Sequence, residues 1–280
     1  MWFFMDIIQA IIIGLVQGLT EFLPVSSSAH LVFIQHLLGL TDSSIAFDVL
    51  LHVGTLVAVV VYFFKDICLM IYAFFLSLKD LFTGKFMKGV KEEPYKKLAW
   101  LVIIATIPVG VVGLLFNDAV TALFTGITIP AFFLLITGVL LYVSQRMNTG
   151  KIDESNIGLK ESIIMGCGQA IAVMPGLSRS GTTIAAGLFS GLDKEFAAKF
   201  SFILSIPAIL GAAVVQLKDL PAMDANIGAY IAGFIVAAIS GYLAIKFLLK
   251  IIQEKSLDVF AYYCWIVGII VLIGSLALGW

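Results

Sequence analysis

The sequence predicts an all-α polytopic membrane protein built from two inverted-topology repeats, each a re-entrant helical hairpin plus three transmembrane helices. Composition is the first observation, because 61% of the 280 residues are hydrophobic and only 12% are charged. A soluble domain carries about a quarter of its residues as charged side chains, so the lipid bilayer is the expected solvent. The second observation is a repeated order of apolar segments, and the third is a polar break within each half.

Ten apolar segments of helical length follow one another in two sets of five. In each set a Pro/Ser or Pro/Gly break separates the first two segments, and three longer segments follow. We interpret residues 1–280 as a single membrane domain, with repeat one at about 1–150 and repeat two at about 151–280. The first set lies near 7–23, 26–40, 45–78, 98–116 and 127–146, and the second near 157–174, 178–191, 195–217, 227–252 and 260–279.

Residues at the breaks favour an internal repeat. Gln17 matches Gln169 at an offset of about 152 residues, and Pro24 matches Pro175, although chance recurrence in an apolar chain is the alternative explanation. The short segments 26–40 and 178–191 would be about 21 to 23 Å long, which is marginal for crossing about 30 Å of hydrocarbon. Re-entrant half-helices suit them better, which leaves three crossings per half and inverts the second half relative to the first.

Basic residues predict how the chain is oriented. Tracing it in this way places the lysines and the arginine of the loops on one face, with Lys218 alone on the other. The positive-inside rule makes the lysine-rich face cytoplasmic and leaves both termini and the open end of the first hairpin outside. The loop at 79–97 is then a solvated cytoplasmic connection, with contact to anionic lipid headgroups as the alternative. Charge gives the same result if both hairpins cross fully, but full crossing would carry the two polar tips to opposite faces.

Polar residues gather at the two breaks, where the chain should be apolar. The first break holds Gln17 and Glu21, four residues apart on one helical face, and the second holds Arg179. An ionisable side chain inside a membrane is costly, so we expect Glu21 and Arg179 to face each other, water or a charged ligand. A purely structural Glu21–Arg179 pair is the alternative.

Both breaks also predict an anion site. Ser26, Ser27 and Ser28 should cap and begin one half-helix, and Ser178, Ser180 and Thr183 should do so in the other, although the serines could be caps alone. Two converging helix N-termini offer free amides and positive dipole ends, and Arg179 adds a forked donor. Phosphate is the anion that suits such a site.

A serine hydroxyl at this position could act as a nucleophile. We expect Ser27 to attack phosphorus with Glu21 or His30 as the proton acceptor, while Arg179 holds the developing charge. Mg²⁺ or Ca²⁺ bridging Glu21 and a diphosphate would be chemically sensible, because the carboxylate and the diphosphate both offer hard oxygen ligands. Asp48 and His52, also four residues apart, are interpreted as a structural pair that lines the cavity.

The strings QGLTEFLPVSSSAHL and PGLSRSGTT resemble the two signature regions of the undecaprenyl-diphosphate phosphatase family, the bacitracin-resistance proteins. The resemblance covers essentially the whole chain. It implies hydrolysis of undecaprenyl diphosphate to undecaprenyl phosphate at the outer face of the bacterial cytoplasmic membrane, which recycles the lipid carrier for cell-wall synthesis. It also implies dependence on a divalent cation.

The resemblance assigns site roles to the residues at a few positions. One departure matters, because position 17 is often Glu in the family and is Gln here, so a metal site of Glu21 with Gln17 has only one carboxylate. Glu21 should then carry more of the role of ligand or base. The residues that the family would assign to the site are Gln17, Glu21, Ser27, His30, Ser178, Arg179 and Thr183.

Two other functions compete with this interpretation. A lipid-phosphate flippase would use the same anion site without covalent chemistry, since broken helices in inverted repeats are also a transporter architecture. A non-catalytic membrane scaffold leaves the interior charges unexplained. The expected partners are a polyprenyl diphosphate substrate and membrane lipids, with no nucleic acid. The sequence leaves the oligomeric state open, with a homodimer as one option, and it does not decide between Ser27 and His30 as the nucleophile.

Overall fold

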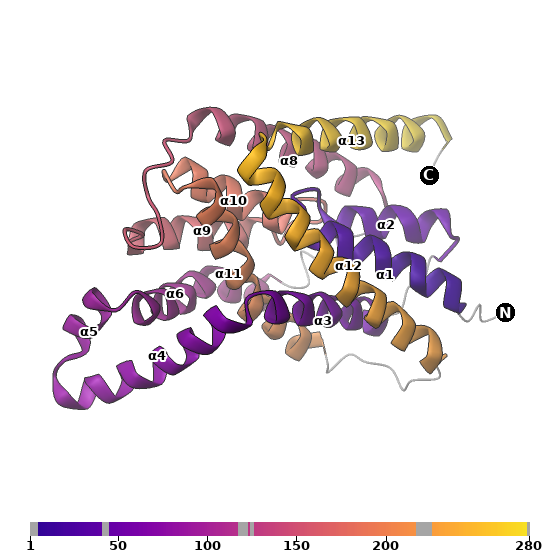
Figure 1. Cartoon of the computed structure of the whole chain (residues 1–280). Coiled ribbons are helices and arrows are strands. Elements are labelled where there is room, and N and C mark those ends of the chain that lie inside the picture. The colour runs from indigo at the N-terminus through magenta and orange to yellow at the C-terminus, as the bar shows by residue number, and fades with distance from the viewer. Residues whose placement is uncertain (1–4, 41–44, 117–122, 124–125, 217–225, 279–280) are drawn as a thin grey trace.

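The computed structural model describes residues 5–40, 45–116, 123, 126–216 and 226–278. Helices form the regular structure of these residues, with one isolated parallel bridge between Ile152 and Leu192, which confirms the predicted all-α class (Figure 1). The helices are α1 (Ile7–Phe22), α2 (Ser27–Leu37), α3 (Ile45–Tyr62), α4 (Phe64–Thr83), α5 (Phe86–Glu92), α6 (Pro94–Leu115), α8 (Thr128–Met147), α9 (Leu159–Ile171), α10 (Arg179–Phe189), α11 (Lys194–Gln216), α12 (Ile227–Glu254) and α13 (Asp258–Leu278).

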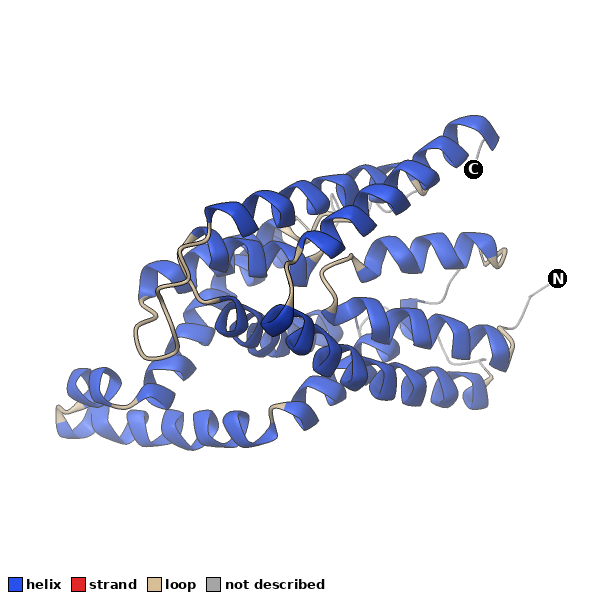
Figure 2. Ribbon diagram, turned by 45° about the horizontal axis from the view of Figure 1, so that its top comes forward, coloured by secondary structure: helices blue, strands red, loops and turns tan. Residues whose placement is uncertain are grey.

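Helices α6, α8, α11, α12 and α13 are long and apolar enough to cross a bilayer. The bent pair α3 and α4 would be a sixth candidate span if it is counted as one. Cartoons from two directions show the ends of the chain at one side of the molecule and α4 and α5 extending to the opposite side (Figures 1 and 2). The predicted sidedness in a membrane stays a prediction, and Lys218 lies outside the described residues.

Each predicted hairpin is present as a helix, a break and a helix of 11 residues. Eleven residues span about 16 Å, roughly half of the hydrocarbon thickness, so α2 and α10 are shorter than the expected segments. Both end on the same motif, because Gly39 and Gly191 adopt positive φ and the amides of Leu40 and Leu192 bond back five residues. These matched ends are consistent with a repeat, whose inverted topology stays a prediction.

The prediction of one continuous helix over 45–78 is wrong. The chain turns by 84° at Phe63, between α3 and α4. Phe63 is buried against Phe202 at a ring-centroid distance of 6.1 Å, while Asp66 one turn later accepts a hydrogen bond from Lys199 Nζ at 3.0 Å. These tertiary contacts hold the two segments in different directions, and neither Gly nor Pro marks the bend in the sequence.

The segment 79–97 is also more ordered than the predicted solvated connection. Helix α4 runs to Thr83, α5 occupies Phe86–Glu92, and α6 already begins at Pro94. Lys96 is buried, and its Nζ lies 2.8 Å from Asp80 Oδ2 and 3.2 Å from Glu93 Oε1. The two carboxylates explain how a lysine can lie inside this connection.

Small residues bring the first helix of each hairpin close to a long helix. A Cβ at Gly14 of α1 would lie 2.5 Å from the Gly233 carbonyl oxygen of α12, and one at Gly166 of α9 would lie 2.3 Å from the Ala105 carbonyl oxygen of α6. Such contacts let helix backbones approach closely in a membrane. They fix α1 and α9, and therefore the breaks that follow them, against the long helices.

Candidate active site

Glu21 is the centre of a buried polar cluster at the end of α1. Its Oε1 accepts a hydrogen bond from Arg179 Nη2 at 2.6 Å. Its Oε2 accepts one from Gln17 Nε2 at 2.9 Å and one from Ser27 Oγ at 2.7 Å. The Glu21 side chain is 5% exposed and that of Arg179 is 17% exposed. Removing either charge would leave the other one buried without compensation. The contact expected between Glu21 and Arg179 is present.

The two breaks meet through three pairs of residues that are far apart in sequence. Besides the ion pair, the Gly176 amide donates to Ser28 Oγ at 3.2 Å, and Ser180 Oγ donates to the Leu23 carbonyl oxygen at 3.1 Å. Gly176 has φ +92°, and an added Cβ would lie 2.2 Å from the Pro130 carbonyl oxygen. Only glycine therefore fits this turn, which aligns the second break against the first.

Serine caps set the start of both short helices, as the sequence predicts. Ser26 Oγ accepts from the Ala29 amide at 3.3 Å, and Ser178 Oγ accepts from the Gly181 amide at 3.0 Å. Ser26 adopts φ +68°, a conformation uncommon for a residue with a side chain, and this turn brings the following Ser27 to Glu21. First-turn amides of a helix have no acceptor within it, so both helix starts offer donors to an anion.

In each cap the two serine hydroxyls also lie close to each other. Ser26 Oγ lies 3.2 Å from Ser28 Oγ, and Ser178 Oγ lies 3.3 Å from Ser180 Oγ. Thr183 is different, because its hydroxyl bonds to the Arg179 carbonyl oxygen at 2.8 Å and to Ser201 of α11. The structure thus gives Thr183 a bond that ties α10 to α11, and its predicted role in phosphate binding stays a prediction.

His30 is held away from Glu21. Its Nδ1 donates to the Ser26 carbonyl oxygen at 2.8 Å, and its Nε2 lies 2.8 Å from Tyr263 Oη of α13. The His30 and Tyr263 rings are stacked with their centroids 5.7 Å apart. Both ring nitrogens of His30 are therefore engaged, and neither bonds to Ser27.

His52 lies at the edge of the cluster, as expected of a residue that lines the cavity. Its Nε2 lies 3.7 Å from Glu21 Oε2, a contact that the sequence does not predict. Asp48 does have a structural contact, because its Oδ1 accepts from Gln35 Nε2 at 2.9 Å. The i, i+4 spacing was the available signal, but it could not show which face of α3 meets α1.

Residues 10–270 match the family described as bacitracin resistance protein BacA. The chain belongs to this family. Its relatives include three proteins named undecaprenyl-diphosphatase, each matched over nearly its full length. The protein of Methanobrevibacter smithii is 66% identical over 97% of this chain and 99% of its own. Those of Methanosphaera stadtmanae and Alkaliphilus metalliredigens are 49% and 45% identical, over 98% and 97% of this chain and all of their own.

Two buried polar atoms of the cluster lack a hydrogen-bond partner among the described residues. They are Gln17 Oε1 and Arg179 Nη1. A buried polar atom without a partner is costly, so a ligand that satisfies both would be favoured. Arg179 can bind a phosphate oxygen through Nη1 while Nη2 stays on Glu21.

The donor set also fits a divalent cation shared with a substrate. Gln17 Oε1 is a buried hard oxygen without a hydrogen-bond partner among the described residues, on the side chain that donates to Glu21. No group of three His, Cys, Asp or Glu residues that could hold a metal occurs in the described part of the chain. A cation here would therefore take most of its ligands from diphosphate oxygens and water, as Mg²⁺ commonly does.

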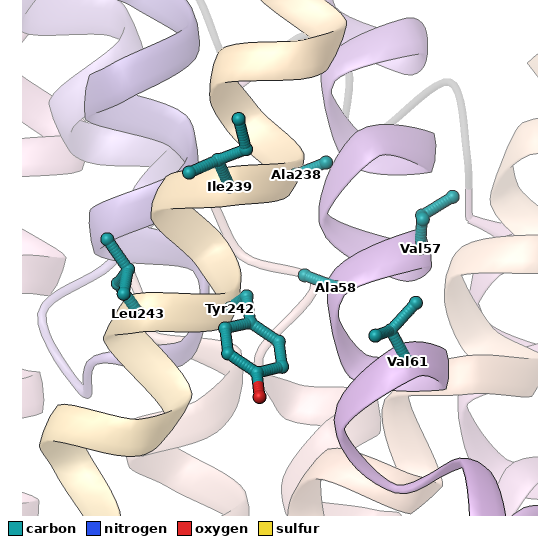
Figure 3. Close-up of a pocket in the computed structure, with 7 residues that line it drawn as sticks. All are labelled: Val57, Ala58, Val61, Ala238, Ile239, Tyr242 and Leu243. Carbon is teal, nitrogen blue, oxygen red and sulfur yellow. The ribbon is translucent and has the colours of Figure 1, made fainter.

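A surface groove between α3 and α12 lies apart from this cluster. It has a volume of about 250 Å³ and is lined by Val57, Ala58, Val61, Ala238, Ile239, Tyr242 and Leu243 (Figure 3). Its lining is apolar except for the Tyr242 hydroxyl. Side chains of this kind on a membrane protein suit contact with lipid chains, and they offer nothing that would bind a phosphate.

Proposed function

We propose that this protein is an undecaprenyl-diphosphate phosphatase that releases inorganic phosphate and leaves undecaprenyl phosphate. The observation that carries the proposal is the hydrogen bond from Ser27 Oγ to Glu21 Oε2, beside Arg179 in one buried cluster. A hydroxyl, a carboxylate that can accept its proton and a cation beside them are the groups that phosphoryl transfer to serine needs. The family and the names of the relatives support the same activity.

Ser27 is the nucleophile in this proposal. As Ser27 Oγ bonds to the terminal phosphorus, its proton passes to Glu21 Oε2 and the bond between phosphorus and the bridging oxygen breaks. Undecaprenyl phosphate leaves, and a phosphoserine remains. Water then attacks phosphorus, Ser27 Oγ leaves and takes the proton held by Glu21, and both protons of the attacking water leave with the phosphate. Atoms and charge balance over the two steps.

Arg179 and the two helix starts stabilise the charge that spreads over the phosphoryl oxygens. Arg179 Nη1 is a donor without a hydrogen-bond partner among the described residues, and the first-turn amides of α2 and α10 add dipoles of the same sign. Donors already in place before the reaction contribute most when the site excludes water. Mg²⁺ or Ca²⁺, held by Gln17 Oε1, Glu21 and the diphosphate, would neutralise further charge on the substrate.

His30 has a smaller part in this mechanism than Ser27. Both of its nitrogens are bonded elsewhere, and its Nδ1 bond to the Ser26 carbonyl oxygen supports the turn that positions Ser27. We therefore propose that His30 orients the turn. The alternative is that His30 itself attacks phosphorus, which would leave a phosphohistidine during turnover.

The proposed site opens to the extracytoplasmic side and serves recycling of the lipid carrier for cell-wall synthesis. The side that carries the chain ends is opposite the lysine-rich region around α5, which supports this orientation. Sealed vesicles of known orientation, given substrate only on the outside, should release phosphate when the chain ends face outward.

Purified protein in liposomes that contain undecaprenyl diphosphate tests the activity. We expect wild-type protein to release phosphate, Ser27→Ala and Arg179→Ala to lose nearly all release, and His36→Ala, in an exposed position on α2, to retain it. Lipid movement across the liposome bilayer without phosphate release would instead favour a flippase and overturn the proposal.

A further inference from the structure

His52 approaches Glu21 from α3, a different helix from those that supply the other three contacts. Its Nδ1 lies 2.8 Å from the Asp48 carbonyl oxygen, which can only accept, so Nδ1 carries the proton of that bond. Nε2 is then the atom that faces the cluster, 3.7 Å from Glu21 Oε2. This is the same carboxylate oxygen that accepts the Ser27 hydroxyl.

The helix that carries His52 is tied to the helix that carries Ser27. Asp48 is tied to α2 by the bond from Gln35 Nε2, and Thr55 Oγ1 donates to the His52 carbonyl oxygen at 2.8 Å. Helix α2 also begins with Ser27. The Gln35–Asp48 bond therefore links the helix that carries His52 to the helix that begins with Ser27.

Exposure distinguishes His52 from the other groups around the carboxylate. Its side chain is 36% exposed, whereas that of Glu21 is 5% exposed. The ring therefore borders the accessible part of the site, beside the carboxylate oxygen that Gln17 and Ser27 also contact. A separation of 3.7 Å is longer than a hydrogen bond, and with the ring proton on Nδ1 both Nε2 and Oε2 are acceptors, so the link between them is a water that donates to both.

We propose that His52 is a further positioning residue of the phosphatase site, which acts through Glu21. A water held between Nε2 and Oε2 keeps Oε2 in the orientation that receives the Ser27 proton. The inference rests on the proposed phosphatase function. A displacement of about 1 Å in a reacting group can lower a rate about 100-fold, so the effect should appear in kcat.

Glutamine and asparagine separate this role from simple packing. A glutamine amide reaches roughly as far as Nε2, whereas an asparagine amide reaches only as far as Nδ1. We expect His52→Ala and His52→Asn to lower kcat about 10- to 100-fold with KM changed little, as positioning losses do. His52→Gln should recover most of the lost kcat.

The experiment compares phosphate release by wild-type protein, these three variants and His36→Ala, with thermal unfolding measured for each. His36→Ala should match the wild type. If wild-type protein releases no phosphate, the proposed function fails. If wild-type protein is active, the inference fails when a folded His52→Ala has wild-type kcat, when only KM changes, or when His52→Gln is no better than His52→Asn.

Discussion

Replacing Glu21 and Arg179 by glutamine, singly and together, tests whether the two breaks are held together by their charges. In Arg179→Gln the Glu21 carboxylate, with its side chain 5% exposed, loses its only cationic partner within hydrogen-bond range among the described residues. Removing one partner of a buried pair costs about 3–5 kcal/mol because the other charge stays uncompensated. Gln17 and Ser27 still donate to Glu21, and Arg179 is partly exposed, so about 2–4 kcal/mol is expected here.

The double variant Glu21→Gln, Arg179→Gln removes both charges and should recover at least half of this loss. For a chain of this size about 2–4 kcal/mol lowers Tm by about 4–15 °C, which thermal unfolding in detergent can resolve. Phosphate release should stay abolished in all three variants. If the losses of the two single variants simply add in the double variant, the side chains do not interact and the proposed geometry is refuted.

Three further changes test the packing and the cation. Gly18→Ala should lower the free energy of unfolding by about 1–3 kcal/mol, because its Cβ would lie 1.9 Å from Ser240 Oγ, while Gly110→Ala, with open space around it, should not. Gly176→Ala should abolish phosphate release, whereas Gly39→Ala, also at positive φ but without neighbours, should retain it; equal activities would contradict the role of the turn. A chelator should stop release and Mg²⁺ or Ca²⁺ should restore it; release that continues without divalent cations would remove the cation from the mechanism.

The hairpins and their meeting were predictable from sequence because the signals are local and strong. Pro24 stops α1, the serine caps start α2 and α10, and two charged residues in apolar surroundings need partners. The contact between Glu21 and Arg179 follows from that need. The end of α2 is set by Gly39, which adopts positive φ just after the helix. The segment predicted over 26–40 ran past this glycine.

Features decided by packing between distant segments were not predictable. The bend at Phe63 depends on contacts with α11, and the burial of Lys96 depends on carboxylates that come together only when α4 and α6 pair. The sequence predicts His30 as a proton acceptor for Ser27 and His52 as a structural partner of Asp48, but the roles of both depend on which neighbour each ring faces. Sequence spacing shows a helical face and cannot show what lies opposite it.

Trapping the covalent intermediate tests the proposed mechanism most directly. Wild-type protein turning over undecaprenyl diphosphate would be quenched without acid, which preserves phosphohistidine, digested, and analysed by mass spectrometry. Attack by Ser27 predicts one phosphoryl group on Ser27, absent from Ser27→Ala and from protein without substrate. A phosphoryl group on His30, or continued phosphate release by Ser27→Ala at the wild-type rate, would contradict the assignment of Ser27 as the nucleophile activated by Glu21.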